Sequence, residues 1–225
     1  MSAVFVTGAG TDVGKTFVSG HLIRALLARG ERVEALKPVV SGFDPANWAM
    51  SDPGVLLTAL GRPHDDDTLA AISPWRYGAA LSPDMAATLE GRAVDCRAVI
   101  NYCRNWIAGH QDMLTVIEGA GGVMSPVDAG TTGLDLMAPL AAPAVLVGGS
   151  YLGAISHVLT AIVALRSRGI LLKAVVVSES AAAGTPFDET VASITRLAEF
   201  SPVIAAPRGD SDLRWRETLA DAVLA

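Results

Sequence analysis

Residues 3–16, AVFVTGAGTDVGKT, decide the fold of this chain. The stretch opens with four apolar residues, which is typical of a parallel strand buried on both faces. Three glycines follow, at positions 8, 10 and 14, and glycine lets the backbone turn tightly where other residues cannot. Lys15 and Thr16 then begin a predicted helix. A strand, a glycine-rich loop and a helix in this order predict a phosphate-binding site, because backbone N–H groups and the helix N-terminus attract phosphate oxygens.

The loop departs by one residue from the phosphate-loop pattern G-x-x-x-x-G-K-[ST]. The first glycine of that pattern would fall on Ala9, and Gly8 stands one position earlier. Lys15 supplies a full positive charge for phosphate oxygens, and the Thr16 hydroxyl can ligate Mg²⁺. The alternative interpretation is a plain glycine turn before a helix, and the apolar strand ahead of the loop argues against it.

Strand and helix patterns alternate along the rest of the chain. Strands are predicted at 3–6, 32–37, 114–117, 144–147, 171–177 and 203–205, with helices between them and a last helix at the end. Residues 38–54 are predicted to be a loop, residues 55–60 a short helix and residues 61–80 an excursion at one edge. This alternation predicts an α/β fold of the phosphate-loop NTPase type, with a mostly parallel sheet covered by helices on both faces. We expect a single domain over residues 1–225.

Composition narrows the class of protein. The chain has 225 residues, of which 51% are hydrophobic, and a net charge of −6, which argues against a nucleic-acid or anionic-membrane partner. No apolar run reaches the roughly 18 residues of a membrane span. The first residues, MSAVFVTG, lack the basic region of a signal peptide. We therefore expect a cytoplasmic protein, with Cys96 and Cys103 as reduced core thiols.

Acidic residues follow two of the predicted strands. In an open parallel sheet, ligands bind beyond the carboxyl ends of the strands. Glu118 ends an apolar strand, and Asp52 lies in the loop after the second strand. Together with Thr16 they supply the oxygen ligands that Mg²⁺ prefers. The alternatives are a surface acid for Glu118 and, for Asp52, a helix N-cap before Pro53, which is compatible with metal binding.

Lys37 ends the second strand, just before Pro38. It is predicted to point toward the same face as the phosphate loop, where it would offset the negative charge that gathers on a transferred phosphoryl group. The alternative is a solvated lysine at a strand end. The guanine-reading sequence N-K-x-D is absent, so GTP is not favoured.

With these motifs assembled, the chain resembles the dethiobiotin synthetases of biotin biosynthesis. The resemblance rests on FVTGAGTDVGKT at 5–16, KPVVSG at 37–42, SD at 51–52, LSP at 81–83, EGAGG at 118–122 and LGAISH at 152–157. It implies a homodimeric enzyme that uses ATP and Mg²⁺ to join CO2 or bicarbonate to 7,8-diaminononanoate. The ring of a cyclic urea closes through a carbamate and a carbamic-phosphoric anhydride. We expect no nucleic-acid or membrane partner.

The resemblance also assigns roles to residues of this chain. It implies that Lys37, Lys15 and Thr11 are catalytic and that Thr16, Asp52 and Glu118 bind Mg²⁺. The implied nucleotide-binding residues are Asp12, Val13, Gly14, Lys15, Thr16, Phe17, Asp52, Glu118, Gly119, Ala120, Gly121, Ser178, Glu179, Pro207 and Arg208. The implied substrate-binding residues are Thr11, Lys37, Ser41, Ser82, Gly121, Gly122 and Ser156.

Four positions depart from that family's pattern. Ser178-Glu179 replaces an Asn-Asp pair that reads the adenine in well-known members. A serine hydroxyl discriminates less than an amide does, because it rotates freely. We therefore predict weaker discrimination among nucleoside triphosphates. Ser156 and Thr190 replace an Asn and a Tyr that reach the substrate across the dimer in some members.

Two other functions share this sequence pattern. One is an ATPase switch of the partitioning or cell-division-positioning type, which dimerises on ATP binding. Such proteins usually carry a second lysine at the start of the phosphate loop, and residues 7–10 here are TGAG. The other is an amidoligase acting on a corrin ring, which often carries a glutaminase domain that 225 residues cannot hold.

Overall fold

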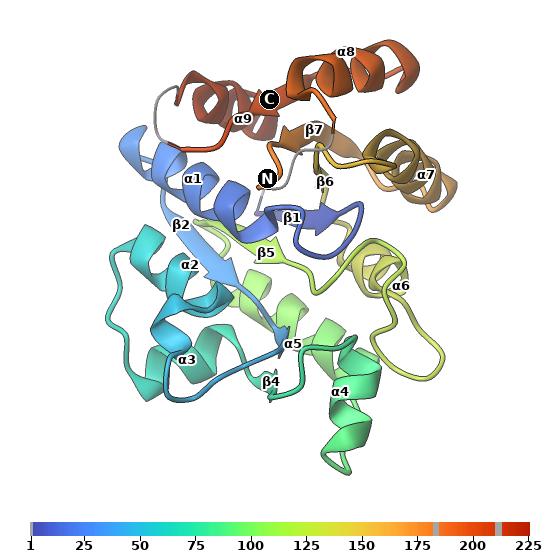
Figure 1. Ribbon diagram of the computed structural model, residues 1–225. Helices are drawn as coiled ribbons and strands as arrows, with labels where there is room; N and C mark the ends of the chain where they lie inside the picture. The colour runs from blue at the N-terminus through green and yellow to red at the C-terminus, as the bar shows by residue number, and fades with distance from the viewer. Residues whose placement is uncertain (1, 182–184, 210–212) are drawn as a thin grey trace.

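The computed structural model of this protein describes residues 2–181, 185–209 and 213–225. Strands and helices alternate through the described chain (Figure 1). The elements are β1 (Ala3–Gly8), α1 (Lys15–Ala28), β2 (Val33–Leu36), β3 (Val39–Ser41), η1 (Trp48–Met50), α2 (Asp52–Leu60), α3 (Asp66–Ile72), β4 (Trp75–Tyr77), α4 (Pro83–Leu89), α5 (Cys96–Gly109), β5 (Leu114–Glu118), α6 (Gly133–Met137), η2 (Ala138–Leu140), β6 (Ala144–Gly148), α7 (Ala154–Ser167), β7 (Leu172–Ser178), α8 (Phe187–Leu197), β8 (Val203–Ala206) and α9 (Arg214–Leu224).

The main sheet has six strands in the order β2-β5-β1-β6-β7-β8, and every pairing between them is parallel. This confirms the predicted fold class. All six residues of β1 are buried, because strands on both sides and helices on both faces enclose it. The strand that precedes the phosphate loop is therefore the rigid centre of the molecule.

Helices cover the sheet on both faces. The helix α1 packs against β1, β2 and β5, and Figure 1 shows it in front of these strands with α5 on the far side. Residues of α1 such as Leu22, Ile23 and Leu26 are fully buried against the sheet. Because α1 begins directly after the phosphate loop, this packing fixes the position of the loop. In the described part of the chain, no helix is long and apolar enough to cross a bilayer.

The stretch predicted as a loop after the second strand is more ordered than expected. It contains the short strand β3 and the helical turn η1, and α2 already begins at Asp52 rather than at Val55. Ser51, not Asp52, occupies the N-cap position of α2, so the N-cap alternative for Asp52 was wrong. Pro53 in the first turn suits a helix start at Asp52 because its missing N–H needs no partner there.

The excursion at 61–80 contains the helix α3 and the strand β4. Asp65 and Thr68 form a reciprocal capping box at the start of α3. The acidic residues 65–67, which look like a polar loop in the sequence, are therefore the beginning of a helix. The strand β4 pairs in parallel with β3 in a separate two-stranded sheet. The helix α6 was not predicted, whereas the two cysteines are free and buried as expected.

Candidate active site

The carboxyl ends of three neighbouring strands form the site. The strands β2, β5 and β1 are adjacent and parallel, with Val6 level with Glu118 and Leu36 level with Ile117. The phosphate loop follows β1, Lys37 follows β2 and Glu118 ends β5. The pairing of parallel strands therefore brings together residues that are far apart in the sequence, as predicted.

The phosphate loop depends on its glycines. Gly14 has φ +91°, and a Cβ atom there would lie 2.5 Å from Ser178 Oγ at the end of β7. A Cβ atom on Gly8 would lie 2.7 Å from the Gly10 carbonyl oxygen. Side chains at these two positions would thus collide with the loop itself or with its neighbour. These close contacts require glycine at positions 8 and 14, although Asp12 in the same loop also has a left-handed backbone, with φ +55°.

Lys15 folds back over the loop. Its ammonium donates a hydrogen bond to the Gly10 carbonyl oxygen at 3.1 Å. Burial, together with the nearby Lys37 charge, lowers the pKa of Lys15 to about 8. A positive group that is poorly solvated and close to another cation is well suited to receive an anion.

Lys37 lies between two carboxylates. Its ammonium is 2.7 Å from Glu118 Oε1, 2.8 Å from Asp52 Oδ2 and 3.0 Å from the Gly119 carbonyl oxygen. The Lys37 side chain is only 3% exposed. Burial alone would lower the pKa of Lys37, but the two carboxylates outweigh it and the pKa lies above the usual lysine value. The same pairing holds the pKa of Asp52 below its usual range against the effect of burial.

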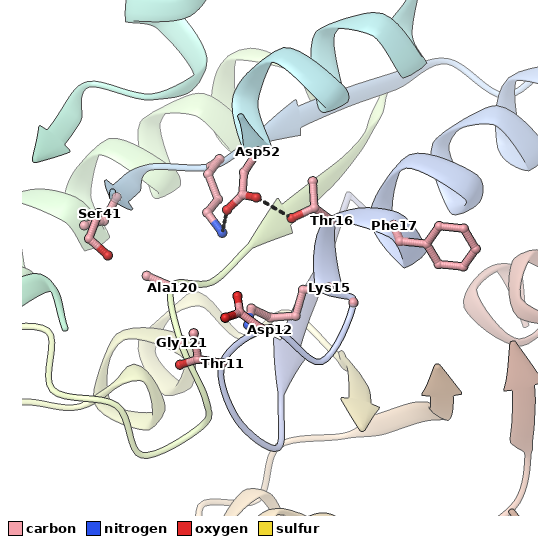
Figure 2. Close-up of a pocket in the computed structure, with 12 residues that line it drawn as sticks. Thr11, Asp12, Lys15, Thr16, Phe17, Ser41, Asp52, Ala120 and Gly121 are labelled. Atoms are coloured by element: carbon pink, nitrogen blue, oxygen red, sulfur yellow. Dashed lines mark hydrogen bonds and ion pairs between the residues drawn. The ribbon is translucent and has the colours of Figure 1, made fainter. Parts of the chain in front are cut away.

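The Thr16 hydroxyl faces the same two acids. Its oxygen lies 2.7 Å from Asp52 Oδ1 and 2.8 Å from Glu118 Oε1. Figure 2 shows Thr16 and Asp52 pointing toward each other within the pocket lining. A hydroxyl has one proton, so it can donate to only one of the two carboxylates at a time. The oxygens of Thr16, Asp52 and Glu118 thus lie close together, although the Thr16 hydroxyl can satisfy only one of the two carboxylates.

These oxygens fit a magnesium ion. The second carboxylate oxygen of Glu118 is buried and has no hydrogen-bond partner, although Glu118 is fully buried. Mg²⁺ is bound by oxygen, and it usually keeps several waters and binds only one or two carboxylates together with substrate phosphates. In the described ranges, no cluster of three or more His, Cys, Asp or Glu side chains forms a metal site on its own. Two carboxylates and a hydroxyl beside a phosphate loop meet the magnesium pattern.

A pocket of about 340 Å³ lies over these groups (Figure 2). Its lining comprises Thr11, Asp12, Gly14, Lys15, Thr16, Phe17, Lys37, Val39, Ser41, Asp52, Ala120 and Gly121. All of these except Val39 were predicted as site residues from the sequence. Val39 was missed because an apolar side chain carries no chemical signal; its only clue was its place in the KPVVSG segment.

A second pocket of about 300 Å³ adjoins the first and shares Asp12, Gly14 and Phe17 with it. Its other lining residues are Val13, Ser178, Glu179, Ser180, Ala181, Arg208 and Gly209. The backbone N–H of Arg208 donates to the Glu179 carboxylate at 2.8 Å. This hydrogen bond joins the segments that follow β7 and β8. The pocket brings together predicted residues from the loop and from the last two strands, and Ser180, Ala181 and Gly209 were not predicted.

Other predicted residues lie apart from these two pockets. Gly119 and Gly122 line a narrow slot of about 20 Å³ beside Glu118. Ser82 occupies the N-cap position of α4, but its hydroxyl lies 2.5 Å from Asp84 Oδ1 instead of capping the helix. Ser156 is exposed on α7, and Pro207 is not among the residues that line either pocket. Thr190 is buried and donates to the Pro186 carbonyl oxygen.

Solved structures confirm the class of fold. The cell-division ATPase MinD of Pyrococcus furiosus matches with a TM-score of 0.57 and 16% identity, over 100% of both chains. The MinC:MinD cell division protein complex of Aquifex aeolicus contains a chain that matches with a TM-score of 0.54 and 15% identity, over 99% of this chain and 88% of that one. At these identities the likeness extends to the fold alone.

Sequence comparisons identify the family. A model described as an AAA domain matches residues 2–208. The ATP-dependent dethiobiotin synthetase BioD of Phenylobacterium zucineum is 48% identical over 100% of this chain and 96% of its own length. The protein of the same name from Caulobacter sp. strain K31 is 49% identical over 100% and 95%. Identity of this extent over both full lengths means that the chain belongs to the dethiobiotin synthetase family.

Proposed function

We propose that this protein uses ATP to carboxylate 7,8-diaminononanoate with CO2 and to close the product into the cyclic urea dethiobiotin, with ADP and phosphate released. The observation that carries the proposal is that Lys15, Lys37, Thr16 and Asp52 line one pocket beyond a glycine-rich loop, while the buried Glu118 carboxylate contacts both Thr16 and Lys37. The names of the full-length relatives support ATP dependence and the biotin pathway.

In this proposal the two adjoining pockets hold the nucleotide. The triphosphate lies along residues 12–17, with its terminal phosphate in the larger pocket near Lys15 and Lys37. The nucleoside extends into the second pocket, between Phe17 and the Ser178-Glu179 pair. Pro207 and Arg208 follow β8, and Arg208 lines that pocket. Phe17 and Gly14 line both pockets, so they mark the passage between nucleoside and phosphates.

The chemistry needs positive charge beside the terminal phosphate. One amine of the substrate takes up CO2 and releases a proton to give a carbamate. A carbamate oxygen then attacks the γ-phosphorus and ADP leaves, which forms a carbamic-phosphoric anhydride. The second amine attacks the carbamoyl carbon, and phosphate leaves as the ring closes. Lys15 and Lys37 offset the charge that accumulates at the γ-phosphate, and Thr11 binds between the phosphate and the carbamate.

Thr16, Asp52 and Glu118 hold the Mg²⁺ ion of the proposal. When bound, this ion supplies Lewis-acid charge to the phosphate oxygens. The fold holds both carboxylates in place, because Glu118 is buried at the end of a central strand and Asp52 lies in the first turn of α2. Glu118 also receives Lys37, so the ligands and the catalytic cation are held in one network.

The diamine in this proposal lies on the opposite side of the larger pocket from the nucleoside. Ser41 and Gly121 line that side (Figure 2). In this proposal Gly122, from the adjoining narrow slot, and Ser82, at the start of α4, complete the substrate site. Ser156 belongs to the same substrate site through a homodimer, in which it reaches the partner's pocket. Leu152, just before α7, is 85% exposed, and Val163, on α7, is 65% exposed. These exposed apolar side chains support a face that the partner subunit covers in the proposed dimer. Sedimentation velocity tests the dimer, and a monomer at micromolar concentration would refute it.

The positioning-switch alternative is not favoured by any feature of the site. Its structural relatives share the fold at 16% identity, whereas the relatives named as synthetases share almost half of all residues. The start of the phosphate loop, residues 7–10, also lacks the second lysine of such switches.

Phosphate release distinguishes the two functions. The purified protein is incubated with Mg²⁺ and ATP, and phosphate is measured with and without the diamine and bicarbonate. We expect release to require both co-substrates and to be matched by one cyclic urea per phosphate. Release that is indifferent to the diamine and unaccompanied by urea would refute the proposed function.

A further inference from the structure

The segment at 72–75 runs directly beside Lys37. The Lys37 N–H donates to the Ile72 carbonyl oxygen at 2.9 Å, and the Ser73 hydroxyl donates to the Lys37 carbonyl oxygen. The Trp75 N–H then donates to the Pro38 carbonyl oxygen at 3.1 Å, and β4 continues this pairing along β3. One short segment thus hydrogen-bonds both the backbone N–H and the backbone carbonyl oxygen of Lys37.

Ser73 is itself firmly held. It is 0% exposed, its N–H donates to the Leu69 carbonyl oxygen at 2.9 Å, and its carbonyl oxygen accepts from the Arg76 guanidinium at 2.7 Å. It ends α3, whose first turn is fixed by the capping box of Asp65. The position of the Ser73 hydroxyl is therefore determined by the helix and by β4, not by the pocket.

Lys37 needs a fixed main chain because its side-chain contacts are all made by residues of the candidate site itself. The ammonium is held by Glu118, Asp52 and the Gly119 carbonyl oxygen, and two of these are ligands in the proposed magnesium site. A lysine side chain has four rotatable bonds, so a small movement of its backbone is carried to the ammonium. A shift of 1 Å at a catalytic group can cost on the order of a hundredfold in rate.

We propose that Ser73 is a positioning residue for the catalytic ammonium of Lys37: its buried hydroxyl, bonded to the Lys37 carbonyl oxygen, fixes the main chain from which that ammonium extends. This rests on the proposed function, since it assumes that Lys37 acts on the transferred phosphate. It also gives the segment at 61–80 a role, because α3 and β4 carry the hydroxyl to this place.

The test compares Ser73→Ala with Ser19→Ala. Both serines are 0% exposed, but the Ser19 hydroxyl has no hydrogen-bond partner, so Ser19→Ala makes the same chemical change without removing a bond. For Ser73→Ala we expect about a tenfold loss of kcat, with the KM for ATP and the Kd of ATP within about twofold of the parent. Ser19→Ala should retain the parent kcat. Equal kcat values for the two variants would overturn the proposal, as would a loss that appears only in KM.

A double-mutant cycle shows whether Ser73 acts through Lys37. In a Lys37→Met background, Ser73→Ala should leave the residual kcat unchanged, because the ammonium that it positions is gone. If Ser73→Ala costs the same factor in both backgrounds, its role is general to the structure and the proposal fails. The proposed function fails differently: the parent protein itself would then show no diamine-dependent phosphate release.

Discussion

The Lys37 ammonium lies 2.7 Å from Glu118 Oε1, and both side chains are almost completely buried. The ammonium also contacts Asp52, so it touches both carboxylates of the proposed magnesium site. Lys37 is therefore the counter-ion of these carboxylates in this structure. In the proposed mechanism, a divalent cation that binds there would compete with Lys37 for the same oxygens, and the displaced ammonium would become available to the phosphate.

This competition predicts that losing Lys37 strengthens metal binding. Mn²⁺ binding to the nucleotide-free protein, followed by electron paramagnetic resonance, should be about tenfold or more tighter in Lys37→Met than in the parent. Lys15→Met is the matched control, because Lys15 lines the same pocket and donates to Gly10 rather than to either carboxylate. Direct competition would be refuted by equal gains in the two variants, or by no gain in Lys37→Met.

The same lysine should be essential for turnover. We expect Lys37→Ala to lower kcat by about a hundredfold or more while ATP still binds, because one group that stabilises the transition state is lost. Lys173→Met on β7, away from the described pocket linings, serves as the control and should retain the parent rate. Steady-state phosphate release and equilibrium ATP binding provide the two measurements. A near-normal kcat in Lys37→Ala would remove the catalytic role assigned to it.

Gly14 should tolerate no side chain. Gly14→Ala would combine a left-handed backbone conformation with the clash against Ser178 Oγ, whereas Gly30→Ala has φ +81° and open space. We expect Gly30→Ala to cost about 1 kcal/mol in the free energy of unfolding, and Gly14→Ala about twice that or more with loss of ATP binding. Chemical denaturation and ATP titration measure these effects. Similar costs at the two sites would show that the contact with Ser178 is unimportant.

The nucleoside pocket should discriminate weakly between bases. Ser178 offers a single rotating hydroxyl, and one Glu179 oxygen already accepts the Arg208 N–H. In competition assays we expect CTP and GTP to support turnover within about tenfold of ATP, since few fixed donors and acceptors remain to reject them. Ser178→Ala should change this ratio little. A strong preference for ATP that persists in Ser178→Ala would mean that backbone groups read the base.

Much of the site was predictable because parallel strands place their carboxyl ends together. Lys37, Glu118 and the phosphate loop each follow an apolar strand, so their convergence needs only the correct fold. Val39 and Ser73 were not predictable in this way. Val39 lies within KPVVSG, but its apolar side chain carries no chemical signal, and Ser73 lies outside every motif. The pairing of β3 with β4, which the sequence did not predict, brings the segment at 72–75 beside Lys37.

The central claim is that a carbamate oxygen attacks the terminal phosphate held by Lys15 and Lys37. Oxygen-18 in freshly supplied CO2 tests it most directly, because that oxygen must leave with the phosphate when the ring closes. We predict one labelled oxygen in each phosphate released, measured by mass spectrometry in the first minute before CO2 exchanges with water. Phosphate that carries no label would contradict the account, since its fourth oxygen would then have come from water.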